Sequence, residues 1–171
     1  ESGVSPRAFP MQGKALVVTD SDEHDETGHL IEDAANRTAM VRKRLRKLEG
    51  LRSDIWQPRL ETTPKAETTI IGWGSTYGAI REAAQKLGKS GLPVNHLHLN
   101  QVWPFPAETI TSALSNSKHS YVVENNATGQ MAKLIRSETG IAVSGGVNKF
   151  DGRPFSSDEI FAAIVKEASK W

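Results

Sequence analysis

The sequence predicts an α/β fold, with a mostly parallel sheet covered by helices on both faces. Strand-like apolar runs alternate with helical patterns from Ala66 to the end of the 171-residue chain. The clearest unit is residues 66–90, where a β-rich run at 68–73 passes through a glycine-bearing turn into an amphipathic pattern. A change of period from two to about 3.6 across one tight turn is typical of the first half of a strand–helix–strand unit.

The later elements follow the same alternation. We expect further strands at 95–99, 120–124 and 141–144, and helices at 76–89, 106–115, 129–139 and 157–170. Pro106 suits a first helical turn, where its missing N–H costs nothing. Ser156 followed by Glu159 has the spacing of a capped helix start. Strands that alternate with helices favour a parallel sheet with right-handed crossovers.

The residues before this region predict a strand–loop–helix connector. A short strand at 14–19 leads into an acidic loop at 20–29, and a basic helix follows at 33–49 with Gly50 as its stop. That helix has a thin apolar stripe, so we expect it either to clasp a larger body or to lie between two bodies. Residues 51–65 contain two prolines and no sustained period, which predicts a linker. The expected division is therefore 1–64 and 65–171.

Composition excludes several classes of protein. The chain is 37% apolar and 24% charged, which permits a normal core, and its net charge of +1 argues against binding nucleic acid by bulk charge. It has no cysteine, so disulfides, cysteine-bound metal or iron–sulfur clusters and thiol nucleophiles are excluded within it. No apolar run approaches the ~20 residues that cross a bilayer. The start resembles no signal peptide and lacks Met, so we expect a cytoplasmic protein and a fragment of a longer one.

Two strand-to-helix turns supply the candidate binding residues. In the first turn, Gly74 and Ser75 follow a strand, and such turns can bring backbone N–H groups to an anion. A tight turn made for helix–sheet packing is the favoured alternative. In the second turn, Asn125, Asn126 and Gly129 follow Glu124 at a strand end. These residues either line a ligand site or satisfy loop backbone groups, with Glu124 as a brace.

Three other features of the sequence are not specific enough to assign a function. His24 and His29 in the acidic loop could hold a metal or act as a base, but a solvated or docking loop is favoured. The basic helix more readily forms a solvated or inter-subunit face than a nucleic-acid site. His96 and His98 share one strand face and could line a site with Gln101, although packed or solvated histidines are the default. We assign no catalytic residue and no metal ligand.

Several motifs together resemble one enzyme family. They occur in order along nearly the whole chain: Ser5-Pro6-Arg7-Ala8-Phe9-Pro10, Val18-Thr19-Asp20, Glu23-His24-Asp25-Glu26-Thr27-Gly28, the basic helix from Met40 to Leu48, Gly72-x-Gly-Ser, Trp103-Pro104-Phe105-Pro106 and Val123-Glu124-Asn125-Asn126-x-x-Gly129-Gln130. This set is similar to the C-terminal part of the alpha subunit of 2-oxoacid:ferredoxin oxidoreductases, the 2-oxoglutarate type in particular.

The resemblance implies a fold and a reaction. Residues 1–64 would be the tail of a thiamine-diphosphate-related domain plus a connector helix. Residues 65–171 would form a transketolase C-terminal-like three-layer α/β/α sandwich, with room for an antiparallel edge strand. Such enzymes convert a 2-oxoacid and coenzyme A into an acyl-CoA and carbon dioxide and reduce ferredoxin.

The resemblance also implies which parts lie elsewhere. Thiamine diphosphate, Mg²⁺ and iron–sulfur clusters would belong to the whole complex, whose beta subunit, with gamma or delta subunits, would be the partner. Asn125 and Asn126 follow no Gly-Asp-Gly motif, so they do not form a magnesium–diphosphate site. This chain would be a non-catalytic portion used for subunit assembly and for shaping the active-site approach.

The main alternative is a stand-alone α/β module that binds nucleotides or anions. It would use the turns at Gly74–Ser75 and Thr128–Gly129. A rise in heat stability of the isolated chain with nucleotide or coenzyme A would favour it.

Overall fold

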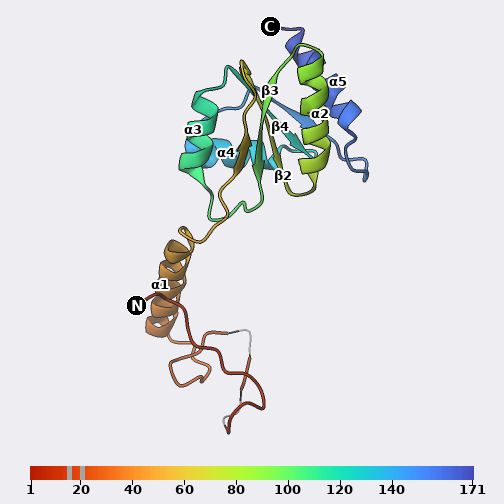
Figure 1. The fold of residues 1–171 in the computed structure, drawn as a ribbon. Helices are drawn as coiled ribbons and strands as arrows, with labels where there is room; N and C mark the ends of the chain where they lie inside the picture. Colours follow the sequence, from red (N-terminus) through yellow and green to blue (C-terminus); the bar gives the residue numbers. More distant parts are fainter. Residues whose placement is uncertain (15–16, 20–21) are drawn as a thin grey trace. The chain divides into compact units, whose positions relative to one another are not determined.

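The computed structural model describes residues 1–14, 17–19 and 22–171. The chain divides into two compact units, Glu1–Ile55 and Trp56–Trp171. Figure 1 shows the helices and strands of the second unit: β1 (Arg59–Glu61), β2 (Thr68–Trp73), the short 3-10 helix η1 (Gly74–Thr76), α2 (Tyr77–Lys89), β3 (Val94–Leu99), α3 (Ala107–Ser115), β4 (His119–Glu124), α4 (Gln130–Thr139), β5 (Gly145–Asn148) and α5 (Ser157–Ala168).

One five-stranded sheet organises the second unit. Its strand order is β1-β3-β2-β4-β5. All neighbouring strands pair in parallel except β1, which pairs antiparallel with β3. The mostly parallel sheet confirms the predicted α/β fold, and β1 is the antiparallel edge strand for which the family resemblance left room.

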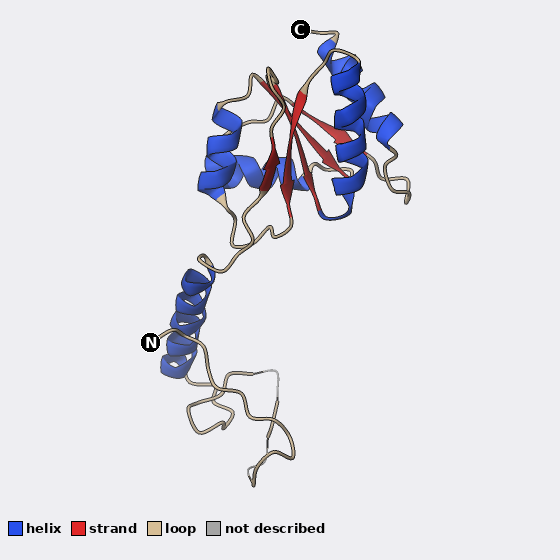
Figure 2. Cartoon of the chain, in the orientation of Figure 1, coloured by secondary structure: helices blue, strands red, loops and turns tan. Residues whose placement is uncertain are grey.

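Helices cover both faces of this sheet (Figure 2). Neighbouring residues of β2 show why: Ile70 packs in the core beneath α2 and α5, and Ile71 in the core beneath α3 and α4, both with no exposed surface. Because a strand sends successive side chains to opposite faces, a strand buried on both sides reads as a continuous apolar run. The sandwich therefore has the three layers that the resemblance implies.

Two sequence predictions were wrong at the sheet edges. The last strand was expected at 141–144, but β5 spans Gly145–Asn148. A Cβ on Gly145 would lie 3.2 Å from a ring carbon of Tyr121, so only glycine fits easily at this register. Ile141 and Val143 instead pack from the loop against the core. The sequence did not predict a strand here because β5 begins with two glycines, and glycine is depleted in strands.

The second error concerns the predicted linker at 51–65. Its central residues form β1, with Arg59 opposite His98 and Glu61 opposite His96. A strand of three residues is too short to show an alternating pattern. The compact unit consequently begins at Trp56, whereas the assignment of residues 1–64 to a separate thiamine-related domain stays a prediction.

The first unit is built on the helix α1 (Ala34–Leu51). Asp33 caps it by accepting a hydrogen bond from the Asn36 backbone N–H at 2.9 Å, and the helix runs through Gly50 instead of stopping there. The expected strand at 14–19 includes residues 15–16, outside the described part, and residues 17–19 are not in a strand. Residues 20–21 of the acidic loop are likewise outside it.

Helix α1 has no buried residue of its own in the described structure. Two of its basic side chains bind the loop before it, because Arg37 and Arg44 both form ion pairs with Glu23. Those hydrogen bonds, with Arg44 the larger contributor, lower the pKa of Glu23 from 4.5 to about 2. That this helix clasps a larger body or lies between two bodies stays a prediction. Among the described helices, none is long and apolar enough to span a membrane.

Candidate functional site

The strand order places a topological switch point between β2 and β4. From β2 the chain crosses through α2 to β3 on one side, and from β3 it crosses through α3 to β4 on the other side. The two crossovers therefore leave in opposite directions, and the loops at the carboxyl ends of β2 and β4 diverge. Ligands of open α/β sheets bind in the crevice at such a point.

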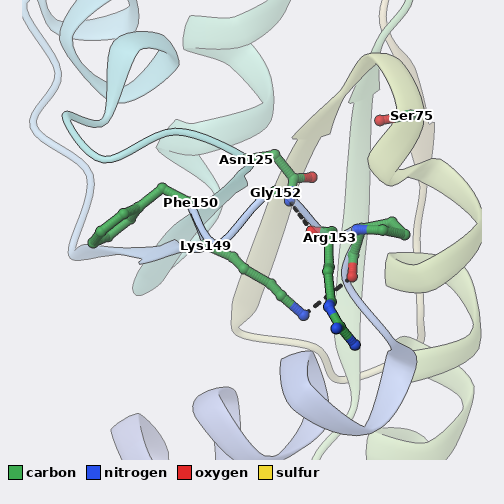
Figure 3. Close-up of a pocket in the computed structure, with 7 residues that line it drawn as sticks. Ser75, Asn125, Lys149, Phe150, Gly152 and Arg153 are labelled. Carbon is green, nitrogen blue, oxygen red and sulfur yellow. Dashed lines mark hydrogen bonds between the residues drawn. The ribbon is translucent and has the colours of Figure 1, made fainter.

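A cavity of about 440 Å³ lies at this switch point (Figure 3). Three loops line it: Ser75 follows β2, Asn125 follows β4, and the stretch from Lys149 to Pro154 follows β5. The carboxyl ends of three strands thus converge on one pocket. This is the candidate functional site.

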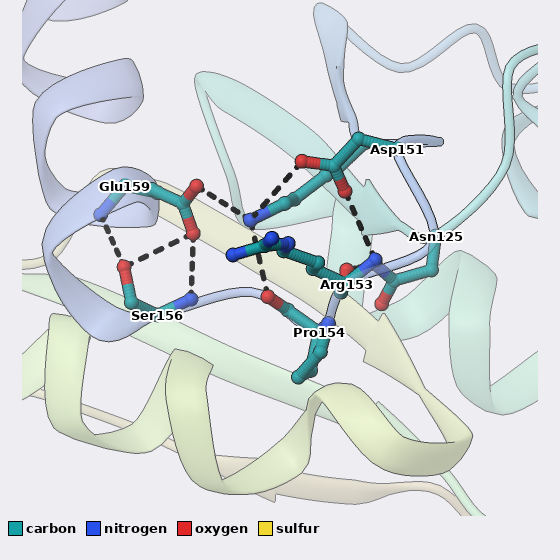
Figure 4. A network of polar contacts seen from close by, with 7 residues as sticks. Asn125, Asp151, Arg153, Pro154, Ser156 and Glu159 are labelled. Atoms are coloured by element: carbon teal, nitrogen blue, oxygen red, sulfur yellow. Dashed lines mark hydrogen bonds and ion pairs between the residues drawn. The ribbon is translucent and has the colours of Figure 1, made fainter.

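Lys149 holds the third loop in place. Its ammonium lies 2.5 Å from a carboxylate oxygen of Glu159 and donates to the Pro154 carbonyl at 3.1 Å (Figure 4). The hydrogen bond from Lys149, followed by those from Ser156, lowers the pKa of Glu159 from 4.5 to about 2. Lys149 is therefore occupied by the protein's own acceptors and serves mainly to shape the pocket.

Ser156 ties the same loop to α5 through a capping box. Its hydroxyl accepts from the Glu159 N–H at 3.2 Å, and the Glu159 carboxylate accepts from the Ser156 N–H at 2.7 Å. We expect Ser156→Ala to lower the free energy of unfolding by about 1 kcal/mol, because a helix N–H loses its acceptor.

Urea unfolding followed by circular dichroism measures the effect of Ser156→Ala. Ser115→Ala is the matched control, since within the described residues this exposed serine donates only to the Ser112 carbonyl, and its loss should cost less than about 0.5 kcal/mol. Equal losses in the two variants would contradict the role of Ser156 as a cap.

Arg153 is the cation that the pocket leaves available. The Asn125 side-chain amide donates to the Arg153 carbonyl at 3.3 Å, and the Arg153 N–H donates to Asp151 at 3.0 Å. These contacts fix the Arg153 backbone, while its guanidinium has no carboxylate partner in the described residues. A guanidinium in a pocket with an amide and a hydroxyl suits an anionic ligand group.

Glu124 and Asn126 have structural roles instead. The Glu124 carboxylate is 1% exposed and accepts hydrogen bonds from Met131 N–H at 2.9 Å and from the Asn126 amide at 2.7 Å. The Asn126 oxygen accepts from three successive N–H groups, at residues 128–130. Together they satisfy the N-terminal donors of α4, which is the brace that the sequence allowed as an alternative.

The predicted binding residues therefore separate into two groups. Ser75 and Asn125 line the pocket, and Gly74 is the exposed neighbour of Ser75. Asn126 and Gly129 do not line it; Gly129 has φ of +65° at the start of α4 and borders a different groove. Whether any of the five residues binds a ligand stays a prediction. Arg153 and Lys149 were missed, because only the position of β5 brings their loop to the switch point.

The two strand histidines are packed, as the default interpretation held. His96 and His98 are 2% and 3% exposed and lie against the Tyr77 ring, with centroid distances of 5.3 and 5.0 Å. Gln101 does not join them, because its side chain accepts from the Trp56 N–H. They are not part of the candidate site.

The donor set does not fit a metal-bound diphosphate cofactor. Across residues 1–14, 17–19 and 22–171, no cluster of three or more histidine or acidic side chains could hold a metal ion. The oxygens of Glu124 and Asn126 already accept backbone and amide hydrogen bonds. In the acidic loop, Asp25 accepts from Thr27 and from the His29 N–H at 3.0 Å. The described residues therefore supply no set of free ligands for Mg²⁺.

Comparison with known families decides the relationship. The model of the pyruvate:ferredoxin oxidoreductase core domain II matches residues 66–160, more than half of the chain. The chain belongs to this family. Core domain II thus corresponds to the sandwich that carries the pocket, and the resemblance found in the sequence is confirmed.

Curated relatives extend the similarity beyond core domain II. The chain is 34% identical over 169 residues to the alpha subunit of 2-oxoacid:ferredoxin oxidoreductase 1 from Sulfurisphaera tokodaii, covering 97% of the chain and 26% of that protein. It is 36% identical over 137 residues to 2-oxoglutarate oxidoreductase subunit KorA from Mycobacterium tuberculosis, covering 78% of the chain and 20% of that protein. The chain therefore spans about a quarter of the length of these relatives.

Solved structures agree with this assignment. The 2-oxoglutarate:ferredoxin oxidoreductase from Magnetococcus marinus, which has 2-oxoglutarate, coenzyme A and succinyl-CoA bound, matches with a TM-score of 0.82 and 32% identity over 98% of this chain and 29% of that one. A split-gene transketolase matches with a TM-score of 0.52 and 18% identity over 65% of this chain and 41% of that one. The second match shows the fold alone and confirms the transketolase-like sandwich.

Proposed function

We propose that this chain is the C-terminal, non-catalytic portion of the alpha subunit of a 2-oxoacid:ferredoxin oxidoreductase. The alignment of 97% of the chain with about a quarter of an alpha subunit carries this proposal. The described residues present no free set of metal ligands and the chain has no cysteine, which supports a role outside the chemical step. In this proposal the chain serves subunit assembly and shapes the approach to the active site.

The proposed reaction of the complete enzyme is the oxidative decarboxylation of a 2-oxoacid to an acyl-CoA. The Magnetococcus relative, with 2-oxoglutarate and succinyl-CoA bound, makes 2-oxoglutarate a good substrate candidate. Thiamine diphosphate, Mg²⁺ and iron–sulfur clusters would be held by other parts of the complex, with ferredoxin as electron acceptor. The beta subunit would be the main partner, with gamma or delta subunits where the enzyme has them, and the complex would be cytoplasmic.

Co-purification from the source cell tests the assembly role. An affinity-tagged copy of the subunit, recovered under anaerobic conditions, should bring down a beta subunit and the brown colour of iron–sulfur clusters. Recovery of the tagged subunit by itself, without either partner or colour, would contradict the proposal.

Arg153 tests the role in the approach to the active site. We expect Arg153→Ala in the assembled enzyme to raise the KM for an anionic substrate about tenfold with little change in kcat, since one charge-assisted hydrogen bond contributes about 1.5 kcal/mol. Lys89→Ala, which removes an exposed cation at the end of α2, is the matched control. If Arg153→Ala changes the KM for neither the 2-oxoacid nor coenzyme A, the pocket does not contribute to the approach of substrate. The assembly proposal would be unaffected by that result.

A further inference from the structure

The two edges of the sheet differ in how they are protected. At one edge, β1 carries Arg59 and Glu61, which form an ion pair at 2.9 Å. At the other edge, β5 consists of Gly145, Gly146, Val147 and Asn148 and carries no charge. Charged side chains normally prevent an edge strand from pairing with another chain. The edge at β5 lacks that protection, and its glycines present no side chains to a strand laid beside them.

A groove of about 420 Å³ runs beside this unprotected edge. Small or apolar residues of the α4 side and of the approach to β5 line it, among them Ala132, Val143 and Gly145. Lys133 and Arg136 are its charged residues, and none of the described residues that line it is acidic. The groove therefore combines an uncharged strand edge with positive charge.

Both cations are available to a partner. Lys133 and Arg136 are exposed and stand three positions apart on α4, a spacing that puts them on one helix face. Neither belongs to an ion pair within the described part of the chain. Carboxylates beside the strand could thus pair with both cations.

We propose that the edge of β5 binds an extended, acidic segment of another polypeptide by strand addition. The backbone of the segment hydrogen-bonds to Gly145–Asn148, and its carboxylates contact Lys133 and Arg136. Strand addition obtains affinity from the main chain and specificity from side chains at alternate positions. This surface lies at the sheet edge, and its inference does not depend on the role proposed for the pocket.

Charge argues against a second copy of this chain as the occupant. Pairing two β5 edges around a two-fold axis would bring both copies of Lys133 and Arg136 to one interface, where like charges repel. The chain's own acidic loop is also a poor occupant. Glu23 is paired with Arg37 and Arg44, and Asp25 is tied into a turn by Thr27 and His29.

Nuclear magnetic resonance of the full 171-residue chain tests this proposal. The probe is a peptide with both termini blocked. Aspartate occupies every second position, and threonine or valine occupies the positions between. We expect it to shift the amide signals of Gly145–Asn148 and to slow their hydrogen exchange. A peptide with lysine in place of aspartate, and one with N-methyl groups at alternate residues, should each bind at least tenfold more weakly.

Charge-reversal variants locate the contact. We expect Lys133→Glu combined with Arg136→Glu to weaken peptide binding at least tenfold. The matched control combines Lys89→Glu with Lys166→Glu, which changes two exposed cations on the helices of the opposite face and should leave binding unchanged.

Three results would overturn the proposal. Binding that tolerates N-methylation would indicate a simple anion site instead of strand addition. An equal loss in the control variant would indicate bulk electrostatics. A dimer seen by analytical ultracentrifugation, with its contact mapped to Gly145–Asn148, would make a second copy the occupant.

Discussion

Replacing Glu124 by alanine is expected to lower the free energy of unfolding of the second unit by about 3 kcal/mol. The carboxylate is buried at the end of β4 and accepts from the Met131 N–H at 2.9 Å and the Asn126 amide at 2.7 Å. Alanine would leave the buried Met131 N–H and the half-buried Asn126 amide without this acceptor. An unsatisfied buried donor costs more than the net gain from making the bond, which is why the loss is large.

The loss should also reach the pocket. Glu124 and Asn126 together hold the start of α4, and the intervening Asn125 donates to the Arg153 carbonyl at 3.3 Å. We expect the amide hydrogens of residues 125–132 to exchange faster in Glu124→Ala, while those of the distant helix α2 change only through the global loss of stability. Urea unfolding and hydrogen exchange measure the two effects.

Two variants control for the loss of a side chain at this end of the sheet. Glu124→Gln keeps one carbonyl acceptor, so its cost should be smaller, about 1 kcal/mol. Glu138→Ala removes an exposed carboxylate from α4 and should cost less than about 0.5 kcal/mol. If Glu124→Ala is no more destabilising than Glu138→Ala, the carboxylate does not brace the helix.

The central part of the fold could be predicted from the sequence because it is determined by burial on both faces. The strand at 68–73 was predicted with the bounds that β2 has, and β3 and β4 begin one residue before the predicted starts. These strands lie inside the sheet between two neighbouring strands, and most of their side chains are buried. In β2 the result is a β-rich run between turn residues, whereas β3 and β4 also bury polar side chains, among them His96, His98 and Glu124.

The edges could not be predicted in the same way. β1 and β5 each have one strand neighbour and are only three and four residues long, with two charged residues in β1 and two glycines in β5. An edge strand forms where its residues can pair in register with the strand beside it, as Gly145 pairs with Tyr121. That information lies in residues distant in sequence, so local periodicity does not contain it.

The candidate site illustrates the same limit. Ser75 and Asn125 could be proposed because each lies within two residues of the end of a strand. Arg153 follows β5 by several residues, and only the sheet order brings its loop beside the other two. Asn126 belonged to the same motif as Asn125, but its oxygen turns to the N–H groups that begin α4. The sequence therefore indicated two of the residues that line this pocket, but not Lys149 and Arg153.

Acidification from pH 7 to pH 4 is expected to remove about 3 kcal/mol of stability through His96 alone. Burial is the main cause that lowers the pKa of His96 from 6.5 to about 4, and the neighbouring His98 adds to it. Both ring nitrogens of His96 lack a hydrogen-bond partner among the described residues. Among the described residues, no hydrogen-bond acceptor therefore holds a proton on this ring.

Burial sets the sign of the effect, and the charges around the pair modify its size. Glu61 on β1 favours the charged form of His96, whereas the cations Arg59 on β1 and Arg81 on α2 oppose it. The hydroxyl of Tyr77 donates a hydrogen bond to Glu61 at 2.8 Å. The unfolded chain takes up a proton below pH 6.5, while the folded chain resists until about pH 4. The contribution is therefore complete above pH 6.5 and is lost as the pH falls toward 4.

His96→Phe isolates this contribution from that of the acidic residues. The phenyl ring keeps the contact with Tyr77 and has no nitrogen to satisfy, so the variant should be as stable as the natural chain at pH 7 or slightly more so. Urea unfolding at pH 7 and pH 4 gives the comparison, with the natural chain losing about 3 kcal/mol more than the variant on acidification. If the free energy of unfolding depends on pH in the same way in both proteins, folding does not lower the pKa of His96. The buried pair His96 and His98 would then have a partner that stabilises the proton.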